Sequence, residues 1–472
     1  MSVPVTKKDF IETNFPRYLI IHRIVINGIS LTPHMQSYVW HPYTQMKEWS
    51  KFDVIVKGKG MWLQDSKGKM LLDGVASMWC NTWGHSRKEL VNAMIAQIKK
   101  LQHSSLFSLT NDKAEDLAEK LIKLAPNMHR VFYSDDGSTA MEISAKMALQ
   151  YWYNRGEKKR TKFSTLENGY HGDTVGAMSL GYVQSFFSKY KPMLFEVLRT
   201  PSPNSYRIPH GFSYEGYQDF CLERVEKTLS KNNDIAAFVM ESGAQVAGGV
   251  IIYPAGFQKK ISKLCKKYDV LFILDEVATG FGRLGSMIEY ETQDSVPDIV
   301  SFGKMLTAGY LPLAATLTNK RIYDVFLGAS HELKHFFHGH TFTGNPLACA
   351  TSLANLSLYK RYNLISKIKR RSGQLKSRIV EISRLGLVGD VRHKGMLMGI
   401  ELVRNKKTKT LLSPDKQIGQ RIFLEAKKHG IYLRSLGHIV MIVPPLAISE
   451  KDLDFLVDGT IETIRKVSDK VI

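Results

Sequence analysis

Short apolar runs alternate with amphipathic stretches through the middle of the chain. Five runs have the length of a β-strand: Val131–Ser134, Lys162–Leu166, Ile235–Glu241, Val270–Asp275 and Ile299–Phe302. Between them, apolar residues recur with helical spacing in 114–124, 140–152, 218–229 and 256–268. This alternation predicts βαβ units, and therefore an α/β fold with a mostly parallel sheet.

The two ends of the chain follow another pattern. Residues 52–83 contain short apolar runs separated by glycine turns, and the tail alternates helical patterns (366–385, 415–429, 450–467) with strand patterns (395–402, 440–443). We expect a small α/β domain built from both ends, residues 35–85 and 366–472, around a large domain of residues 86–365. Residues 1–34 are basic and apolar with charged interruptions, which favours an N-terminal extension, or a start near Met35, over a targeting peptide.

The composition narrows the class of protein. The chain has 472 residues, 44% of them hydrophobic, and a formal charge of +21. Its basic clusters, 158–160 and 406–409, are short and scattered, which favours a solvated basic surface over a nucleic-acid site. Four separated cysteines with no C-x-x-C pair disfavour zinc and disulfides and suit a reducing compartment. No apolar run reaches the length of a membrane span, so a cytoplasmic protein without a membrane partner is expected.

Residues 271–309 carry the most specific chemistry. One apolar run ends in Asp275, a glycine-rich turn follows, and Lys304 comes just after the second run. An acid and a lysine at the ends of neighbouring buried strands can meet over a heteroaromatic ring. The carboxylate would hold a pyridinium proton and the amine would form a Schiff base, as pyridoxal phosphate requires. The alternative is a pair of ordinary strands with a solvated lysine.

Two further motifs follow predicted strands. Asp136 and Gly137 open a helix, where backbone N–H groups can approach a phosphate. Because a carboxylate would repel that phosphate, we expect Asp136 to turn back onto the helix as its N-cap. Tyr170 lies on a glycine-flanked turn and can stack on an aromatic ring, although a loop tyrosine packed on the surface is the alternative.

A glycine-punctuated loop and a lone arginine complete the candidates. Thr341 offers a hydroxyl and an N–H to a phosphate oxygen. His338 and His340 lack a third ligand nearby, so no metal is expected. Arg434 could bind a carboxylate through its planar guanidinium.

The stretch 271–309 resembles the cofactor signature of class III aminotransferases. Segments 39–46 (V-W-H-P-Y-T-Q-M), 169–174, 339–346 and 433–437 resemble the branch of that family that converts 8-amino-7-oxononanoate to 7,8-diaminononanoate in biotin synthesis. The resemblance implies the type I pyridoxal-phosphate fold, pyridoxal 5'-phosphate as cofactor, and a homodimer with shared active sites.

The resemblance also implies a role for each matching position. Lys304 would bind the cofactor and shuttle protons, and Asp275 would pair with its ring nitrogen. The other positions fall into phosphate contacts (Asp136, Gly137, and His340 and Thr341 of the other subunit), ring stacking (Tyr170) and substrate contacts (Tyr43, Gly339, Arg434).

Some positions depart from the family pattern, and the amino donor stays open. Asp136 replaces a common serine, Met78 replaces a tryptophan of some members, and Val246 replaces a usual glycine. The donor could be S-adenosylmethionine or lysine. One rival function is transamination of another ω-amine, such as ornithine or 4-aminobutyrate, which the segment around Tyr43 disfavours. The other is a non-catalytic basic protein that binds nucleic acid, which the Asp275 and Lys304 pair disfavours.

Overall fold

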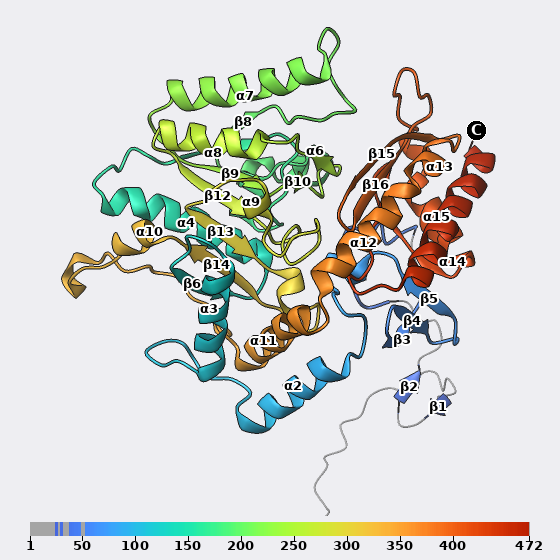
Figure 1. The fold of residues 1–472 in the computed structure, drawn as a ribbon, viewed down its shortest axis with the longest axis horizontal. Coiled ribbons are helices and arrows are strands. Elements are labelled where there is room, and N and C mark those ends of the chain that lie inside the picture. The colour runs from blue at the N-terminus through green and yellow to red at the C-terminus, as the bar shows by residue number, and fades with distance from the viewer. Residues whose placement is uncertain (1–23, 27–28, 32–36, 49–51, 472) are drawn as a thin grey trace, which may run out of the picture.

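The computed structural model describes residues 24–26, 29–31, 37–48 and 52–471. A seven-stranded sheet forms its centre (Figure 1). Six strands point the same way, and one runs antiparallel to both of its neighbours. In sheet order, the strands are β6 (Arg130–Ser134), β14 (Ala314–Thr318), β13 (Ile299–Phe302), β12 (Leu271–Asp275), β9 (Ile235–Glu241), β7 (Lys162–Leu166) and β8 (Val197–Thr200). The predicted α/β class and mostly parallel sheet are confirmed.

Helices cover both faces of this sheet, so its central strands are apolar on both sides. In β12, Ile273 packs in the cluster around α4 (Gly137–Asn154). Phe272 and Leu274 point to the other face, where α7 (Tyr214–Lys231) and α8 (Phe257–Lys267) lie. The other helices of this part are α2 (Lys88–Lys100), α3 (Asp112–Leu124), α5 (Val175–Leu180), α6 (Gln184–Phe187), α9 (Glu289–Thr292), α10 (Lys320–Asp324) and α11 (Pro346–Arg361).

The two ends of the chain share a sheet. β5 pairs in parallel with β17, joining Leu72 to Ile431, and the blue strands lie beside the red C-terminal helices in Figure 1. The four-stranded sheets here contain β3 (Ile55–Lys59), β4 (Trp62–Asp65), β5 (Met70–Asp73) and β17 (Ile431–Tyr432), and β15 (Val388–Lys394), β16 (Leu397–Leu402), β18 (Arg434–Leu436) and β19 (Ile439–Ile442). The helices are α12 (Leu364–Ser377), α13 (Ile379–Ser383), α14 (Ile418–Lys428) and α15 (Glu450–Val471).

This pairing supports the proposed small domain, while the division of the chain at residues 85 and 365 stays a prediction. The predicted extension and the start near Met35 lie largely outside the described residues. Only the two short strands β1 (Ile24–Ile26) and β2 (Ile29–Leu31) fall within them, paired with each other.

Several elements differ from the sequence-based expectation. The single helix expected over 366–385 is interrupted at Arg378, between α12 and α13. The strands that were not predicted include β8, β14, β15, β17 and β18. The prediction missed β15 because its polar residues interrupt the alternation of apolar residues. One of them, Arg392, is buried and pairs with Glu401.

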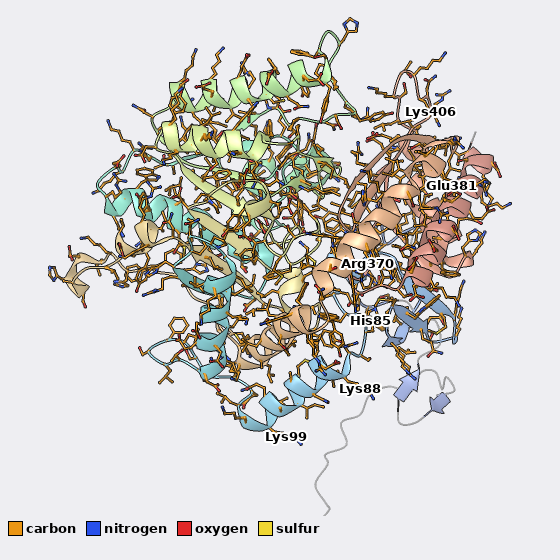
Figure 2. The ribbon with its side chains drawn as sticks, in the orientation of Figure 1. His85, Lys88, Lys99, Arg370, Glu381 and Lys406 are labelled. Atoms are coloured by element: carbon orange, nitrogen blue, oxygen red, sulfur yellow. The ribbon has the colours of Figure 1, made fainter. Side chains whose placement is uncertain are left out.

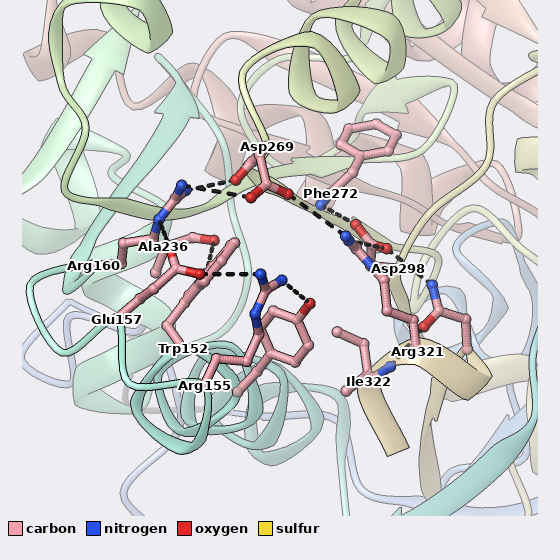
Figure 3. A network of polar contacts seen from close by, with 12 residues as sticks. Trp152, Arg155, Glu157, Arg160, Ala236, Asp269, Phe272, Asp298, Arg321 and Ile322 are labelled. Carbon is pink, nitrogen blue, oxygen red and sulfur yellow. Dashed lines mark hydrogen bonds and ion pairs between the residues drawn. The ribbon is translucent and has the colours of Figure 1, made fainter. Parts of the chain in front are cut away.

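Charged residues tie together the loops at the amino ends of the parallel strands (Figure 3). Asp298 accepts a hydrogen bond from the Phe272 N–H at 3.0 Å and pairs with Arg321 at 2.8 Å. Nearby, Arg160 contacts Asp269, which precedes β12. These contacts stabilise the loops at the amino ends of the strands. The carboxyl ends, at the opposite side of the sheet, are where ligands bind in such folds.

The basic surface is dispersed. Lys99, Arg370 and Lys406 lie on α2, on α12 and in the loop after β16 (Figure 2). This spread is typical of a solvated surface. None of the described helices is long and apolar enough to cross a membrane.

A buried asparagine fixes the backbone after β13, where Lys304 lies. Asn355, on α11, donates from Nδ2 to the carbonyls of Met305 and Leu306 at 2.8 and 3.0 Å. Its Oδ1 accepts from the indole N–H of Trp83 at 2.8 Å. One side chain therefore satisfies three buried polar groups.

Replacing Asn355 by leucine should leave those three groups without partners. We expect the free energy of unfolding to fall by about 3–9 kcal/mol, since each of the three buried unsatisfied groups costs roughly 1–3 kcal/mol. Urea unfolding followed by circular dichroism measures this. Asn232→Leu, at the end of α7, is the control and should cost less than about 1 kcal/mol. An equal loss in both variants would contradict the anchoring role.

Candidate active site

A cavity of about 710 Å³ opens at the carboxyl ends of the parallel strands. Ligands of open α/β sheets bind at this edge. Six of its lining residues carry the argument below: Trp79, Gly137, Tyr170, Glu241, Asp275 and Lys304.

Asp275 is the last residue of β12. Its carboxylate is buried, and each of its two oxygens has a hydrogen-bond partner. Oδ2 lies 2.8 Å from Nδ1 of His171, and Oδ1 accepts from the Val277 N–H at 2.9 Å. Nε2 of His171 is buried and has no hydrogen-bond partner among the described residues. A fixed carboxylate at a strand end can hold the proton of a pyridine nitrogen. Sequence reasoning assigned no role to His171, and its position next to Tyr170 was the available signal.

Lys304 follows β13 and opens the 3₁₀ turn η2 (Lys304–Thr307) in the left-handed backbone region, at φ 43°. Its side chain is half-buried and reaches the cavity, with Nζ 5.8 Å from the ring centroid of Trp79. Loss of hydration lowers the pKa of Lys304, while Asp275 and Glu241 act in the opposite direction. A larger fraction of neutral amine at a given pH makes this lysine a better nucleophile.

Glu241 is a site residue that sequence reasoning missed. It ends β9 beside Asp275 in the sheet register. Its two carboxyl oxygens accept from the N–H groups of Tyr170 and Val246 at 3.2 and 2.8 Å. Burial first, and the negative charge of Asp275 second, raise the pKa of Glu241 to about 8. The signal in the sequence was an acid at the end of an apolar strand, as at Asp275.

The helix N-terminus at the cavity has the predicted capping geometry. Asp136 is the N-cap of α4, and its Oδ1 accepts from the Thr139 N–H at 2.9 Å. A Cβ on Gly137 would lie 2.4 Å from Cγ1 of Val277, so only glycine fits there. Because α4 begins with a capped turn against the cavity, its free N–H groups and dipole favour an anion such as phosphate.

Two tyrosines meet on one carboxylate at the cavity. Tyr43 and Tyr170 both donate their hydroxyls to Oδ1 of Asp173, at 2.7 and 3.1 Å. Burial, followed by Asp173, raises the pKa of Tyr43, and the positive charge of Arg434 opposes this rise. Both phenols therefore stay neutral donors. Asp173 was not a predicted site residue, although it ends the motif that contains Tyr170.

Arg434 lies on β18, outside the lining of the cavity, and its Nη1 is 3.7 Å from Sδ of Met78. Two of the three departures noted in the sequence, Met78 and Val246, lie in this part of the structure. Of these two positions, the buried Val246 lines the cavity and Met78 lies beside Arg434.

The loop around His340 does not line the cavity of its own chain. Gly339 and Thr341 are exposed. Nδ1 of His340 lies 3.9 Å from Asp135, and its Nε2 lies 3.1 Å from His338. Of the predicted residues, these three, together with Tyr43 and Arg434, are not among those that line the cavity within one chain.

The residues fit pyridoxal phosphate. Gly137 leaves room at a helix N-terminus, Asp275 presents a buried carboxylate, and Lys304 presents an amine with a lowered pKa. Together with the sheet topology, this set defines a pyridoxal-phosphate-dependent transferase of fold type I.

Comparisons with known proteins agree with this class. The family described as Aminotransferase class-III matches residues 44–464. Adenosylmethionine-8-amino-7-oxononanoate aminotransferase from Geobacter sulfurreducens is 44% identical over 436 residues, covering 91% of this chain and 96% of the relative. The crystal structure of adenosylmethionine-8-amino-7-oxononanoate aminotransferase from Methanocaldococcus jannaschii has 42% identity and a TM-score of 0.85, covering 91% of this chain and 97% of that chain.

A further solved structure is an amine transaminase from an uncultivated Pseudomonas species in a pyridoxal-phosphate-bound form. It has 32% identity and a TM-score of 0.88, covering 92% of this chain and all of that chain (100%). The chain belongs to the class III aminotransferases, and it is a pyridoxal-phosphate-dependent aminotransferase.

Asp136 variants should separate capping from cofactor contact. Asp136→Ser keeps the cap and removes a charge repulsion of roughly 4 kcal/mol at 4 Å and an effective dielectric of 20. It should bind pyridoxal phosphate at least as tightly as the parent, as measured by fluorescence titration. Asp136→Leu loses the cap and should destabilise the apo-protein by about 1 kcal/mol. A tenfold loss of affinity in Asp136→Ser would mean that the carboxylate itself contacts the cofactor.

Glu241 should make stability depend on pH. Because its folded pKa is raised to about 8, the folded state binds this proton more tightly than the unfolded chain does. The resulting stability is complete below the ordinary glutamate pKa of about 4.3 and is lost as the pH rises through about 8. Urea unfolding of the apo-protein between pH 5 and 9 should show a shallower decline for Glu241→Gln than for the parent. Equal slopes in the two proteins would contradict the assignment.

Proposed function

We propose that this aminotransferase aminates 8-amino-7-oxononanoate to 7,8-diaminononanoate, a step of biotin synthesis. The observation that carries the proposal is the hydroxyl of Tyr43 on Asp173 at the cavity, 2.7 Å apart. Tyr43 belongs to the W-H-P-Y-T segment that distinguishes this branch of the family. The name of the Geobacter relative, at 44% identity, supports the same substrate.

S-adenosylmethionine is the proposed amino donor. The names of both 8-amino-7-oxononanoate relatives contain adenosylmethionine, which favours it over lysine. Met78, which contacts Arg434, stands where some family members have tryptophan, so the donor assay below compares several amines.

The chain's own residues divide the work of the two half-reactions. Bound pyridoxal phosphate supplies an aldehyde for amines and an electron sink. Lys304 Nζ, with its lowered pKa, would hold the cofactor and then take a proton from the carbon bearing the donor's amine. Asp275 would hold its carboxylate beside the ring nitrogen, and Tyr170 would cover the ring. Arg434 would bind the carboxylate of the acceptor, with Tyr43 at the amine end.

We propose a homodimer that completes each cavity with residues of the other subunit. Gly339 and Thr341 are exposed and do not line the cavity of their own chain. A phosphate contact from His340 and Thr341 and a substrate contact from Gly339 would therefore be made across the dimer. Four free cysteines suit a cytoplasmic setting.

A donor-by-donor assay tests the function. The purified enzyme with pyridoxal phosphate is incubated with 8-amino-7-oxononanoate and one donor at a time. The donors are S-adenosylmethionine, lysine, ornithine and 4-aminobutyrate, and the products are identified by mass spectrometry. We expect 7,8-diaminononanoate with S-adenosylmethionine, and none with Lys304→Ala as the control. Failure with every donor, combined with transfer from ornithine or 4-aminobutyrate to 2-oxo acids, would favour the ω-amine alternative.

Arg434→Ala should weaken binding of the acceptor and leave the cofactor in place. Losing a charged contact to a carboxylate costs roughly 2–5 kcal/mol, so the KM for 8-amino-7-oxononanoate should rise at least thirtyfold. The absorbance of bound pyridoxal phosphate should be unchanged. Arg434→Lys keeps the charge, and its KM should lie between those of the parent and of Arg434→Ala. An unchanged KM would remove Arg434 from the substrate site.

A further inference from the structure

The wall of the cavity contains a left-handed turn made without glycine. In α1 (Ala76–Trp79), all four residues have positive φ, at 48°, 48°, 81° and 69°. Side chains of L-amino acids rarely adopt this region, because Cβ crowds the backbone, and they normally do so singly. Four in succession require a strong external constraint.

Asp73, the last residue of β5, supplies this constraint. It is fully buried. Its Oδ1 accepts from the N–H groups of Val75 and Ser77 at 3.3 and 3.1 Å, and its Oδ2 accepts from the Ser77 hydroxyl at 2.7 Å. Nε2 of His85 lies 3.2 Å from the same Oδ2. His85 in turn is anchored to the β3–β4 hairpin through backbone bonds with Gly60.

The turn carries three consecutive side chains to different parts of the site. Met78 contacts Arg434 at 3.7 Å, and the Trp79 ring lies 5.8 Å from Lys304 Nζ. Cys80 lines the cavity, and a Cβ on Gly309 would lie 3.0 Å from its sulfur. This short segment therefore contacts Arg434 and also places an aromatic ring near Lys304.

We propose that Asp73 is a positioning residue for substrate recognition: its carboxylate holds the left-handed turn 76–79, and the turn sets the wall between Lys304 and Arg434. Asp73 touches neither of these two residues. It acts through Met78 and Trp79, whose places depend on the backbone it holds. The naming of the substrate rests on the proposed function, whereas the role of the carboxylate in holding the turn does not.

The experiment compares Asp73→Ala with two matched variants of the holoenzyme. Asp65→Ala is the control, because Asp65 ends β4 and accepts from the N–H groups of Lys67 and Lys69 in a turn that does not line the cavity. The double variant Asp73→Ala with Ser77→Gly tests rescue, since glycine enters positive φ without a Cβ penalty. It also removes the hydroxyl that would be left without its acceptor.

Two readouts are taken for each variant. The first is the KM for 8-amino-7-oxononanoate, which should rise at least tenfold in Asp73→Ala and fall back in the double variant. The second needs no substrate: the rate at which iodoacetamide alkylates Cys80, followed by peptide mass spectrometry. Cys80 is only partly buried, and the other three cysteines are buried. Loosening the turn should change the alkylation rate at least fivefold, with recovery in the double variant.

The outcomes separate this inference from the proposed function. If the parent enzyme makes no 7,8-diaminononanoate, the proposed substrate is wrong, and the alkylation rate still decides the role of Asp73. If Asp73→Ala matches Asp65→Ala in alkylation, or if Ser77→Gly restores nothing, the positioning role is wrong. Should Asp73→Ala not fold, Asp73→Asn keeps one acceptor oxygen. A smaller change of the Cys80 alkylation rate in Asp73→Asn, reversed by Ser77→Gly, then supports the role. An unchanged alkylation rate overturns it.

Discussion

The active site depends on the burial of opposite charges at the ends of neighbouring strands. β9 and β12 each end in an acid, Glu241 and Asp275, and the turn after β13 presents Lys304. Removing these groups from water lowers the pKa of the lysine and raises that of Glu241. Parallel strands are what allow this, because their carboxyl ends meet at one edge. Asp275 keeps its hydrogen bonds from His171 and Val277, which compensate its burial.

The sequence predicted the parts of this site that have local signatures. The strand-end acid, the following lysine and the capped helix start at Asp136 are all readable in short windows, and five strands of the sheet were placed from their apolar runs. Glu241 has the same strand-end position as Asp275, but its partner Tyr170, like the partner Tyr43 of Asp173, lies far along the chain. Glu241 acts on the backbone of Tyr170, 71 positions away. Such contacts have no period or spacing to detect.

The missing strands have a similar explanation. β14 is antiparallel and sits between β13 and β6, so its place follows from the whole sheet and not from its own short run. β15 is stabilised by the buried Arg392 and Glu401 pair, and that pairing makes a polar strand tolerable in a core. The shared sheet of β5 and β17 joins segments about 360 residues apart. Pattern reading suggested a common small domain but could not give the register.

Two segments at the cavity have a strained backbone, and each of the two has a buried polar anchor behind it. Lys304 has positive φ, and its turn is held by Asn355 on α11. The turn 76–79 has positive φ throughout and is held by Asp73 at the end of β5. Neither anchor lines the cavity. Strained conformations persist only where surrounding structure determines them. The geometry of the reacting groups is therefore set one layer away from the substrate, by side chains whose loss the chemistry alone would not reveal.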